Sequence, residues 1–293
     1  MNIHLVDGTY ELFRAHFAVP PVAAPDGRPV SAVRGIIQTM LMLLREDGVT
    51  HVACAFDHVV ESFRNDMFDG YKTGAGTPED LMSQFDLAER AVAALGVVVW
   101  PMVEFEADDA LATAAGKWRD APNVEQVVIC SPDKDLTQMV RGSQVVCLDR
   151  RRKVTLDDAG VREKFGVPPA SIPDYLALVG DAADGIPGVP RWGAKTAAQM
   201  LDRYGHLENI PDDWEQWEVR PRGAQAVAAS LAEHREDAVL YKRLATLRLD
   251  VPLAETLEQL RWEGVPKLEY QALCAELGFE SLMDLPSRWT GEG

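Results

Sequence analysis

Short apolar segments alternate with helix-like segments along the first half of the chain. The apolar segments at residues 3–6, 52–56, 97–100 and 127–131 have the length and composition of buried strands. Amphipathic helices are expected between them, for example from an N-cap at Ser31 to about Glu46, from Pro78 to about Leu95 and from 107 to about 119, and Thr155 is expected to cap another helix further along the chain. Helical connections between consecutive strands produce parallel sheets. The pattern therefore predicts an α/β fold with a mainly parallel central sheet and helices on both faces.

An acidic residue lies at or just beyond the carboxyl end of each predicted strand. These acids are Asp7, Asp57, then Glu106 with Asp108 and Asp109, then Asp133 with Asp135. One such group alone is typical of a helix start or a turn. Parallel strands, however, place their carboxyl ends at one crevice, where open α/β sheets bind ligands. Seven like charges there would repel strongly unless cations lie among them.

The ligand types indicate which cations fit. Carboxylates without a His or Cys cluster favour the hard cations Mg²⁺ or Mn²⁺ over Zn²⁺. Two such ions are a known device for in-line hydrolysis of phosphodiesters. The chain has no glycine loop of the Walker or dinucleotide-binding type, which disfavours nucleotide hydrolysis and hydride transfer. The acids therefore predict cleavage of phosphodiester bonds with two metal ions.

The overall charge at first argues against a nucleic-acid partner. The net charge is −17, whereas phosphate binding usually leaves a basic footprint. Acids gathered around metal ions account for part of this charge, so a local basic path is compatible with DNA binding. No apolar run approaches the ~20 residues of a membrane span, and no signal-peptide pattern begins the chain. We therefore expect no membrane partner. The four cysteines lack CxxC spacing, which predicts buried, reduced thiols in a cytoplasmic protein.

The chain changes character near Asp174. Residues 180–197, GDAADGIPGVPRWGAKTA, contain Asp181 and Asp184 and lead into a helix that runs to about Tyr204. Two short helices joined by a glycine-bounded turn can point backbone N–H groups at a phosphate without reading a base. We expect an α/β domain at 1–173 and a helical region at 174–293. The connection at 58–76 is long, and long connections tend to be functional or mobile.

These segments resemble a known family. VDGTY, AFD, SFR followed by GYK, FEADDALA, SPDKDL, and VGDAADGIPGV with a following GAKTA resemble the 5′ nucleases, which include flap endonucleases and the 5′-3′ exonuclease domain of bacterial DNA polymerase I. The likeness runs in order from about residue 3 to 282, and no polymerase domain follows. It implies one metal cluster drawn from Asp7, Asp57, Glu106, Asp108, Asp133 and Asp135, and a second that uses Asp109, Asp181 and Asp184. The sequence does not assign individual acids to individual ions.

The resemblance also implies two DNA-binding segments. Arg64 to about Gln84, within an arch at about 58–95, resembles the helical arch that passes a single-stranded 5′ end, with Lys72 and Arg64 positioned to steer and polarise the scissile phosphate. Residues 180–204 resemble the helix-three-turn-helix that grips duplex backbone, in which loop carbonyls of many relatives hold a K⁺ ion. The residues expected to bind DNA there are Gly188, Val189, Arg191, Gly193, Lys195 and Thr196.

Three departures from the family pattern stand out. The stretch YKTGAGTPED is about one residue short and lacks the Arg-Pro pair that many bacterial relatives have after Tyr-Lys. Gly185 follows Asp184 where Asn is usual, and Arg191 and Trp192 replace the usual Gly-Ile before Gly193. If the replaced glycine has positive φ, Arg191 strains the turn. The complete acid set still favours an active enzyme.

We expect a stand-alone, monomeric, Mg²⁺-dependent 5′ nuclease of DNA replication and repair. Its expected substrates are DNA with a 5′ flap, a nick or a free 5′ end, and RNA primers on a DNA template. One alternative is a catalytically weak DNA-junction binding protein, suggested by the altered arch and hairpin. Another is a metal-dependent ribonuclease of the related PIN-like architecture, which the hairpin from Gly180 disfavours.

Overall fold

The contacts within the chain divide it into two units. The structure is a computed structural model that describes residues 1–291. Unit 1 comprises Met1–Val60, Gly74–Ser131 and Leu249–Gly293, and unit 2 comprises Glu61–Thr73 and Pro132–Arg248. These units do not coincide with the ranges 1–173 and 174–293 expected from the sequence, and that domain boundary stays a prediction.

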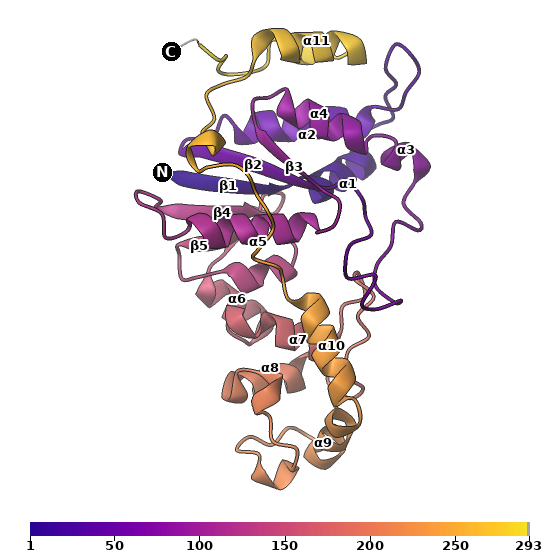
Figure 1. Cartoon of the computed structure of the whole chain (residues 1–293), viewed down its shortest axis with the longest axis vertical. Helices are drawn as coiled ribbons and strands as arrows, with labels where there is room; N and C mark the ends of the chain where they lie inside the picture. Colours follow the sequence, from indigo (N-terminus) through magenta and orange to yellow (C-terminus); the bar gives the residue numbers. More distant parts are fainter. Residues whose placement is uncertain (292–293) are drawn as a thin grey trace. The chain divides into compact units, whose positions relative to one another are not determined.

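Unit 1 contains a parallel sheet. Its elements are β1 (Asn2–Asp7), α1 (Gly8–Ala18), α2 (Ser31–Leu43), β2 (Val49–Asp57), α3 (Glu79–Met82), α4 (Phe85–Ala93), β3 (Val98–Met102), α5 (Ala107–Trp118), β4 (Gln126–Cys130), the 3-10 turns η5 (Glu258–Leu260) and η6 (Glu280–Leu282), and α11 (Lys267–Leu277). The strands lie in the order β3-β2-β1-β4, and every neighbouring pair is parallel (Figure 1). The predicted α/β class with a mainly parallel sheet is confirmed.

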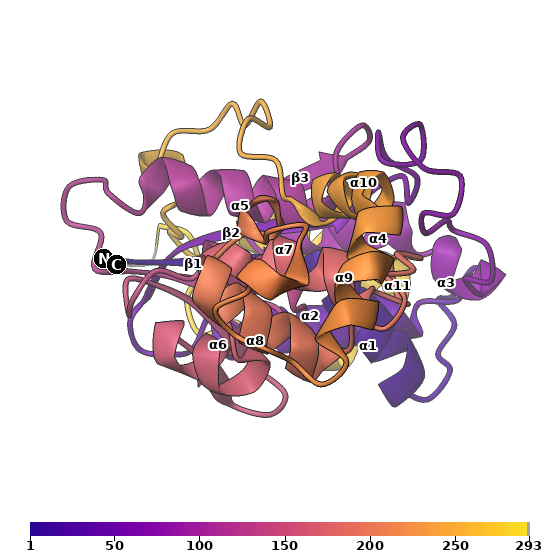
Figure 2. The ribbon, with the colours of Figure 1, turned by 90° about the horizontal axis from the view of Figure 1, so that it is seen from below.

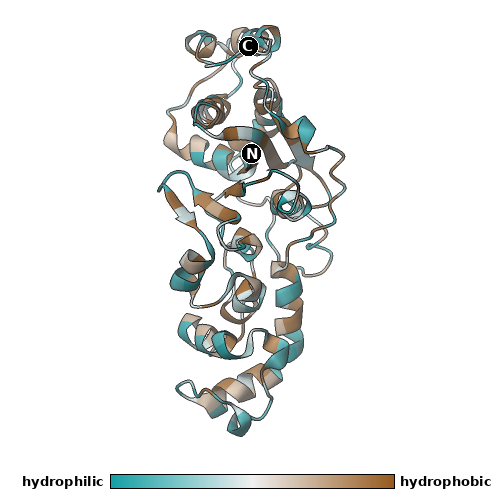
Figure 3. Ribbon diagram, turned by 90° about the vertical axis from the view of Figure 1, so that its left-hand side faces the viewer, coloured by the Kyte–Doolittle hydropathy of each residue, from teal (hydrophilic) through white to brown (hydrophobic). Residues whose placement is uncertain are grey.

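Helices cover both faces of this sheet. The connections from β1 to β3 run in one direction along the sheet, and the connection from β3 to β4 returns in the other. Because such crossovers are right-handed, α5 lies on the face opposite α1 and α2 (Figure 2). α5 packs on all four strands, whereas α1 packs on β2 and α4 on β3. In Figure 3 much of the strand ribbon is brown, the colour of hydrophobic residues.

Unit 2 is mainly helical. Its elements are η1 (Asp135–Met139), β5 (Val145–Asp149), β6 (Val154–Leu156), α6 (Asp158–Phe165), η2 (Pro169–Ser171), α7 (Ile172–Val179), α8 (Ala194–Tyr204), η3 (Leu207–Asn209), η4 (Trp214–Gln216), α9 (Ala224–Glu233) and α10 (Arg235–Ala245). β5 and β6 form an antiparallel pair. α7 packs against both α8 and α10, so the predicted pair of helices around residues 180–193 is present.

Some local predictions were wrong. The expected single helix from Pro78 to about Leu95 is broken into α3 and α4 at Gln84, whose buried side chain accepts hydrogen bonds from the backbone N–H groups of Ala32 and Val33. Gln84 therefore caps α2, and Ser31, the predicted cap, is the first helical residue. Thr155, predicted to cap a helix, lies in β6, and Asp157 caps α6 instead.

The arch segment also differs in secondary structure from its expectation. The described residues between Asp57 and Glu79 contain turns and no helix, so the stretch compared with a helical arch is not helical before α3. Its expected role in passing a 5′ end stays a prediction.

All four cysteines lie in the described part of the chain, where they are buried and form no disulfide. This confirms the expected burial. Within residues 1–291, no helix has the length and apolar character that a membrane crossing requires.

Candidate active site

Asp7 and Asp57 end two neighbouring parallel strands of unit 1. Asp7 pairs in register with Ala55, so both carboxylates lie at the carboxyl edge of the sheet. Asp7 accepts hydrogen bonds from the N–H of Tyr10 at 2.8 Å and from the hydroxyl of Ser131 at 2.8 Å. The bond to Ser131, the residue after β4, ties the ends of β1 and β4 together.

Gly8 and Thr9, the two residues after Asp7, help to fix the positions of Asp7 and Asp57. A Cβ on Gly8 would come within 2.6 Å of the Phe56 ring, so only glycine lets α1 start this close to β2. The Thr9 hydroxyl accepts a hydrogen bond from the N–H of Asp57 at 2.8 Å. The Asp-Gly-Thr sequence thus fixes the positions of both acids.

The third group of acids surrounds the start of α5. The Asp57 carboxylate accepts a hydrogen bond from the N–H of Ala107 at 2.8 Å, which links the end of β2 to this helix. Glu106 and Asp109 form a capping box, with the Asp109 carboxylate 3.1 Å from the N–H of Glu106. Both are buried, while Asp108 is half-buried. The structure therefore gathers the predicted acids of unit 1 at one sheet edge.

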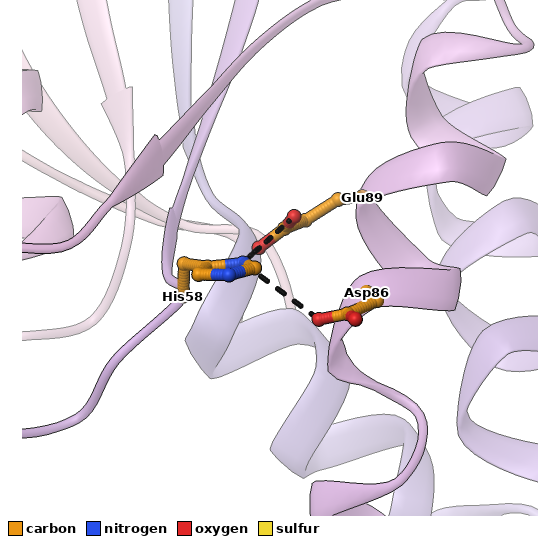
Figure 4. A group of neighbouring side chains, drawn as sticks. All are labelled: His58, Asp86 and Glu89. Carbon is orange, nitrogen blue, oxygen red and sulfur yellow. Dashed lines mark hydrogen bonds and ion pairs between the residues drawn. The ribbon is translucent and has the colours of Figure 1, made fainter.

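A histidine that the sequence analysis did not select lies next to this edge. His58 follows Asp57, and its Nδ1 lies 3.0 Å from Glu89 and 3.7 Å from Asp86, both on α4 (Figure 4). Burial raises the pKa of Glu89, and the hydrogen bond with His58 partly offsets this effect. The Asp86 side chain is highly exposed, unlike a typical metal ligand. Contacts between the end of β2 and α4 therefore account for the cluster of His58, Asp86 and Glu89, and no metal is needed to explain it.

Three predicted acids meet in unit 2. Asp135, Asp181 and Asp184 each place a carboxylate oxygen within 4.8 Å of the others. Asp135 begins η1, and its N–H donates to the exposed Asp133 at 2.9 Å. Asp181 and Asp184 lie in the loop after α7, which paired hydrogen bonds between the backbones of Asp181 and Ile186 close at 2.8 Å each.

Two lysines neutralise part of this charge. Lys72 Nζ lies 3.1 Å from Asp184, and the Lys72 N–H donates to the Asp184 carbonyl at 3.1 Å. Lys134 Nζ lies 2.6 Å from Asp181. Burial lowers the pKa of Lys134, but the hydrogen bond to Asp181 and the surrounding carboxylates outweigh it and raise the pKa overall. Sequence reasoning missed Lys134, although its place between Asp133 and Asp135 was a signal.

Asp135 is buried among charged carboxylates. It is 6% exposed, and burial, followed by the charges of Asp133, Asp184 and Asp181, holds its pKa well above the ordinary value. Its Oδ1 is buried and has no hydrogen-bond partner among the described residues. A buried, unpartnered carboxylate oxygen beside two further carboxylates suits a hard divalent cation, so the residues fit Mg²⁺ or Mn²⁺.

The structure explains why glycine, and not the usual asparagine, stands at position 185. It has φ of 74°, and a Cβ there would lie 2.1 Å from the carbonyl oxygen of Gly70. The usual Asn would tolerate the positive φ but would collide with this carbonyl. The departure at Gly185 therefore allows the segment that carries Lys72 to approach the loop of Asp184.

Arg64 is buried more deeply than a phosphate contact requires. Its side chain is 1% exposed, and its Nε and Nη2 donate to the carbonyls of Leu244 at 2.8 Å and Thr246 at 3.2 Å. These contacts join the arch segment to the end of α10. The role of Arg64 at the scissile phosphate stays a prediction.

The hairpin confirms the predicted strain at Arg191, whose φ is 71°. Trp192 is buried beside it, where its Nε1 donates to the carbonyl of Val227 at 3.1 Å and its ring meets the edge of Trp217. Trp192 thus anchors the turn to α9. An L-residue at positive φ costs roughly 1–2 kcal/mol, and the packing of Trp192 offsets this cost.

The predicted DNA-binding residues fall into two groups. Gly188 and Val189 are buried; a Cβ on Gly188 would lie 2.5 Å from the backbone nitrogen of Gly180, and the Val189 N–H donates to Leu178. Arg191, Gly193 and Lys195 are exposed around the start of α8, and Thr196 is half-buried there. The first group shapes the turn, while the second can meet a phosphate at the helix N-terminus.

Two family models cover most of the chain. Residues 2–166 match the 5′-3′ exonuclease N-terminal resolvase-like domain, and residues 167–267 match the 5′-3′ exonuclease C-terminal SAM fold. The chain is 37% identical over 290 residues to DNA polymerase I of Pseudomonas aeruginosa and 34% identical over 286 residues to that of Bacillus caldotenax. Each match covers 96% of this chain but 31% and 32% of the relative, so the chain spans about a third of their length.

A solved structure supports the same fold. The bacteriophage T5 flap endonuclease, in a complex with DNA and metal ions, is similar with a TM-score of 0.65 and 18% identity. The similarity covers 97% of this chain and 96% of the T5 chain.

Proposed function

The chain belongs to the 5′-3′ exonuclease family, and from this premise we propose that it is a structure-selective 5′ nuclease that hydrolyses DNA phosphodiester bonds with divalent metal ions. The observation that carries the proposal is the trio Asp135, Asp181 and Asp184, with a buried carboxylate oxygen that has no hydrogen-bond partner in the described residues. The acids at the carboxyl edge of the unit 1 sheet provide further ligands of the same type.

We propose that the bound ions are two Mg²⁺ or Mn²⁺. Asp7, Asp57, Glu106, Asp108 and Asp109 in unit 1, and Asp133, Asp135, Asp181 and Asp184 in unit 2, are the candidate ligands. When bound, such ions would activate water and neutralise charge on the leaving oxygen. Structures of the bacteriophage T5 flap endonuclease, a structural neighbour, contain metal ions, which supports metal binding in this proposal.

The chain's own residues bind and orient the DNA in this proposal. Lys72 donates to an oxygen of the scissile phosphate, which requires it to exchange its Asp184 partner for the phosphate. Arg191, Gly193 and Lys195 hold duplex backbone at the start of α8, and carbonyls of the hairpin hold a K⁺ ion. We propose that the protein acts as a cytoplasmic monomer on 5′ flaps, nicks, free 5′ ends and RNA primers on DNA.

Cleavage of end-labelled substrates tests the proposal. A duplex with a 5′ flap, single-stranded RNA and intact duplex are incubated with the protein in Mg²⁺, with EDTA as a control. Incision near the flap junction that leaves a 5′-phosphate, with little cleavage of RNA, is the expected result. Faster cleavage of single-stranded RNA would instead establish a ribonuclease of the PIN-like type. Tight flap binding without incision in Mg²⁺ or Mn²⁺ would establish a junction-binding protein.

A further inference from the structure

We propose that Lys134 is a positioning residue that reserves Asp181 in an ion pair and so competes with a divalent ion for this carboxylate. The inference rests on the proposed function, because it concerns the same group of acids. It adds a role for a residue that lies between two candidate ligands in the sequence.

The hydrogen-bond partners of Asp181 distinguish it from Asp135. Lys134 Nζ lies 2.6 Å from Asp181 Oδ2, and the other oxygen accepts a hydrogen bond from the N–H of Ala183 at 3.0 Å. Both oxygens of Asp181 are therefore engaged within unit 2. Asp135, in contrast, has a buried oxygen without a hydrogen-bond partner in the described part of the chain.

Burial makes the ion pair persistent. The Asp181 side chain is 3% exposed and that of Lys134 is 34% exposed, so water screens the pair less than a surface pair. The pair is also short, as expected for a charge-assisted hydrogen bond. Lys134 therefore holds the Asp181 carboxylate in one orientation within the trio.

A lysine and a divalent ion cannot share this carboxylate without cost. Both are cations, and they would lie close together if they contacted the same carboxylate. They would then repel strongly, because the protein interior screens charge far less than water does. Binding of an ion to Asp181 thus requires Lys134 Nζ to move away, which its partly exposed side chain permits. The ion that uses Asp181 is then bound more weakly than three carboxylates alone would bind it.

A titration of the full chain with Mn²⁺ in the absence of DNA tests this inference. The electron paramagnetic resonance signal of unbound Mn²⁺ gives the number of bound ions and their dissociation constants. In Lys134→Gln, one ion should bind on the order of tenfold more tightly than in the wild type, the factor that about 1.4 kcal/mol gives in an equilibrium constant. Lys134→Met serves as a second variant if the first melts at a lower temperature in EDTA.

Three controls separate the ion pair from general charge. Lys164→Gln removes the same charge from an exposed position on α6, and Lys134→Arg keeps the charge in place; both should bind Mn²⁺ within about twofold of the wild type. In an Asp181→Asn background, Lys134→Gln should have no further effect, because the shared carboxylate is gone.

Unchanged or weaker Mn²⁺ binding by the folded Lys134 variant overturns the inference. An equal gain in Lys164→Gln, or a gain that persists in the Asp181→Asn background, overturns it as well. Flap cleavage by the wild type is measured on the same preparation to keep the two claims apart. Cleavage with no effect of Lys134→Gln on Mn²⁺ refutes only the inference, whereas a wild type that neither binds Mn²⁺ nor cleaves refutes the proposed function too.

Discussion

Replacement of Asp135 by asparagine should stabilise the metal-free protein and weaken its binding of divalent ions. Asp135 is buried, its pKa is held well above the ordinary value by burial and by the charges of Asp133, Asp184 and Asp181, and its Oδ1 is unpartnered among the described residues. Asparagine removes the buried charge and adds an N–H donor that can bond to a neighbouring carboxylate.

The direction with pH follows from the raised pKa. Between the ordinary value of 3.8 and the higher pKa of the folded state, the folded protein binds more protons at Asp135 than the unfolded chain does. The free energy of unfolding therefore falls as pH rises through this range. Because an asparagine side chain does not titrate, the advantage of Asp135→Asn should grow with pH.

The size of the effect follows from the cost of an unsatisfied buried polar atom. That cost is about 1–3 kcal/mol, so Asp135→Asn should raise the free energy of unfolding in EDTA by this amount at neutral pH. The assay is urea unfolding in EDTA at pH values from 5 to 8. Asp202→Asn, which removes the same charge from an exposed position on α8, should change stability by less than about 0.5 kcal/mol.

Addition of Mn²⁺ should reverse the order of stabilities. Bound ions stabilise only the folded state, and the variant loses one ligand for them. A variant that is no more stable than the wild type in EDTA at pH 7 to 8 would refute the reasoning about buried charge. A variant that gains as much stability from Mn²⁺ as the wild type would refute the assignment of Asp135 as a ligand.

Three further substitutions test other parts of the account. Arg191→Gly should raise the free energy of unfolding by about 0.5–1 kcal/mol, because relief of the strained positive φ exceeds the entropy cost of glycine. It should also weaken duplex binding. Urea unfolding measures the first effect and a salt-dependent binding assay the second; a less stable variant would contradict the strain at Arg191. Gly185→Ala should lower the free energy of unfolding by roughly 1–3 kcal/mol, because the alanine Cβ would lie 2.1 Å from the carbonyl oxygen of Gly70. The melting temperature measures this loss, and an unchanged value would contradict the close approach of the two segments. Lys72→Gln should slow single-turnover flap cleavage by about 10²–10³-fold while the affinity for the flap stays nearly unchanged. If instead the affinity falls by this factor and the cleavage rate of the bound flap does not, Lys72 contributes to binding and not to catalysis.

Most of the sheet and the acids at its edge could be predicted from the sequence, because the patterns that indicate them are local. A buried strand is a short run with few charges; Asp7 and Asp57 stand at the ends of two such runs, and Glu106 lies a few residues beyond a third. The strain at Arg191 was also predictable, because the turn needs positive φ at the position where the family usually has glycine.

The remaining features depend on residues far apart in the sequence. Gln84 breaks the predicted helix because its side chain is used to cap α2, which no local pattern indicates. Lys134 and Asp181 pair across a long stretch of chain, and Arg64 donates to carbonyls at the end of α10. Thr155 was misassigned because threonine suits both helix caps and strands, and pairing with β5 decided the outcome.

The most direct measurement of the central claim is single-turnover incision of a labelled 5′-flap duplex as Mg²⁺ is varied. We expect a rate that saturates with Mg²⁺, vanishes in EDTA, and falls at least about 100-fold in Asp133→Ala and in Asp57→Asn, since each removes a candidate metal ligand. Incision that continues in EDTA, or at an undiminished rate in both variants, would contradict a metal-dependent nuclease built on these carboxylates.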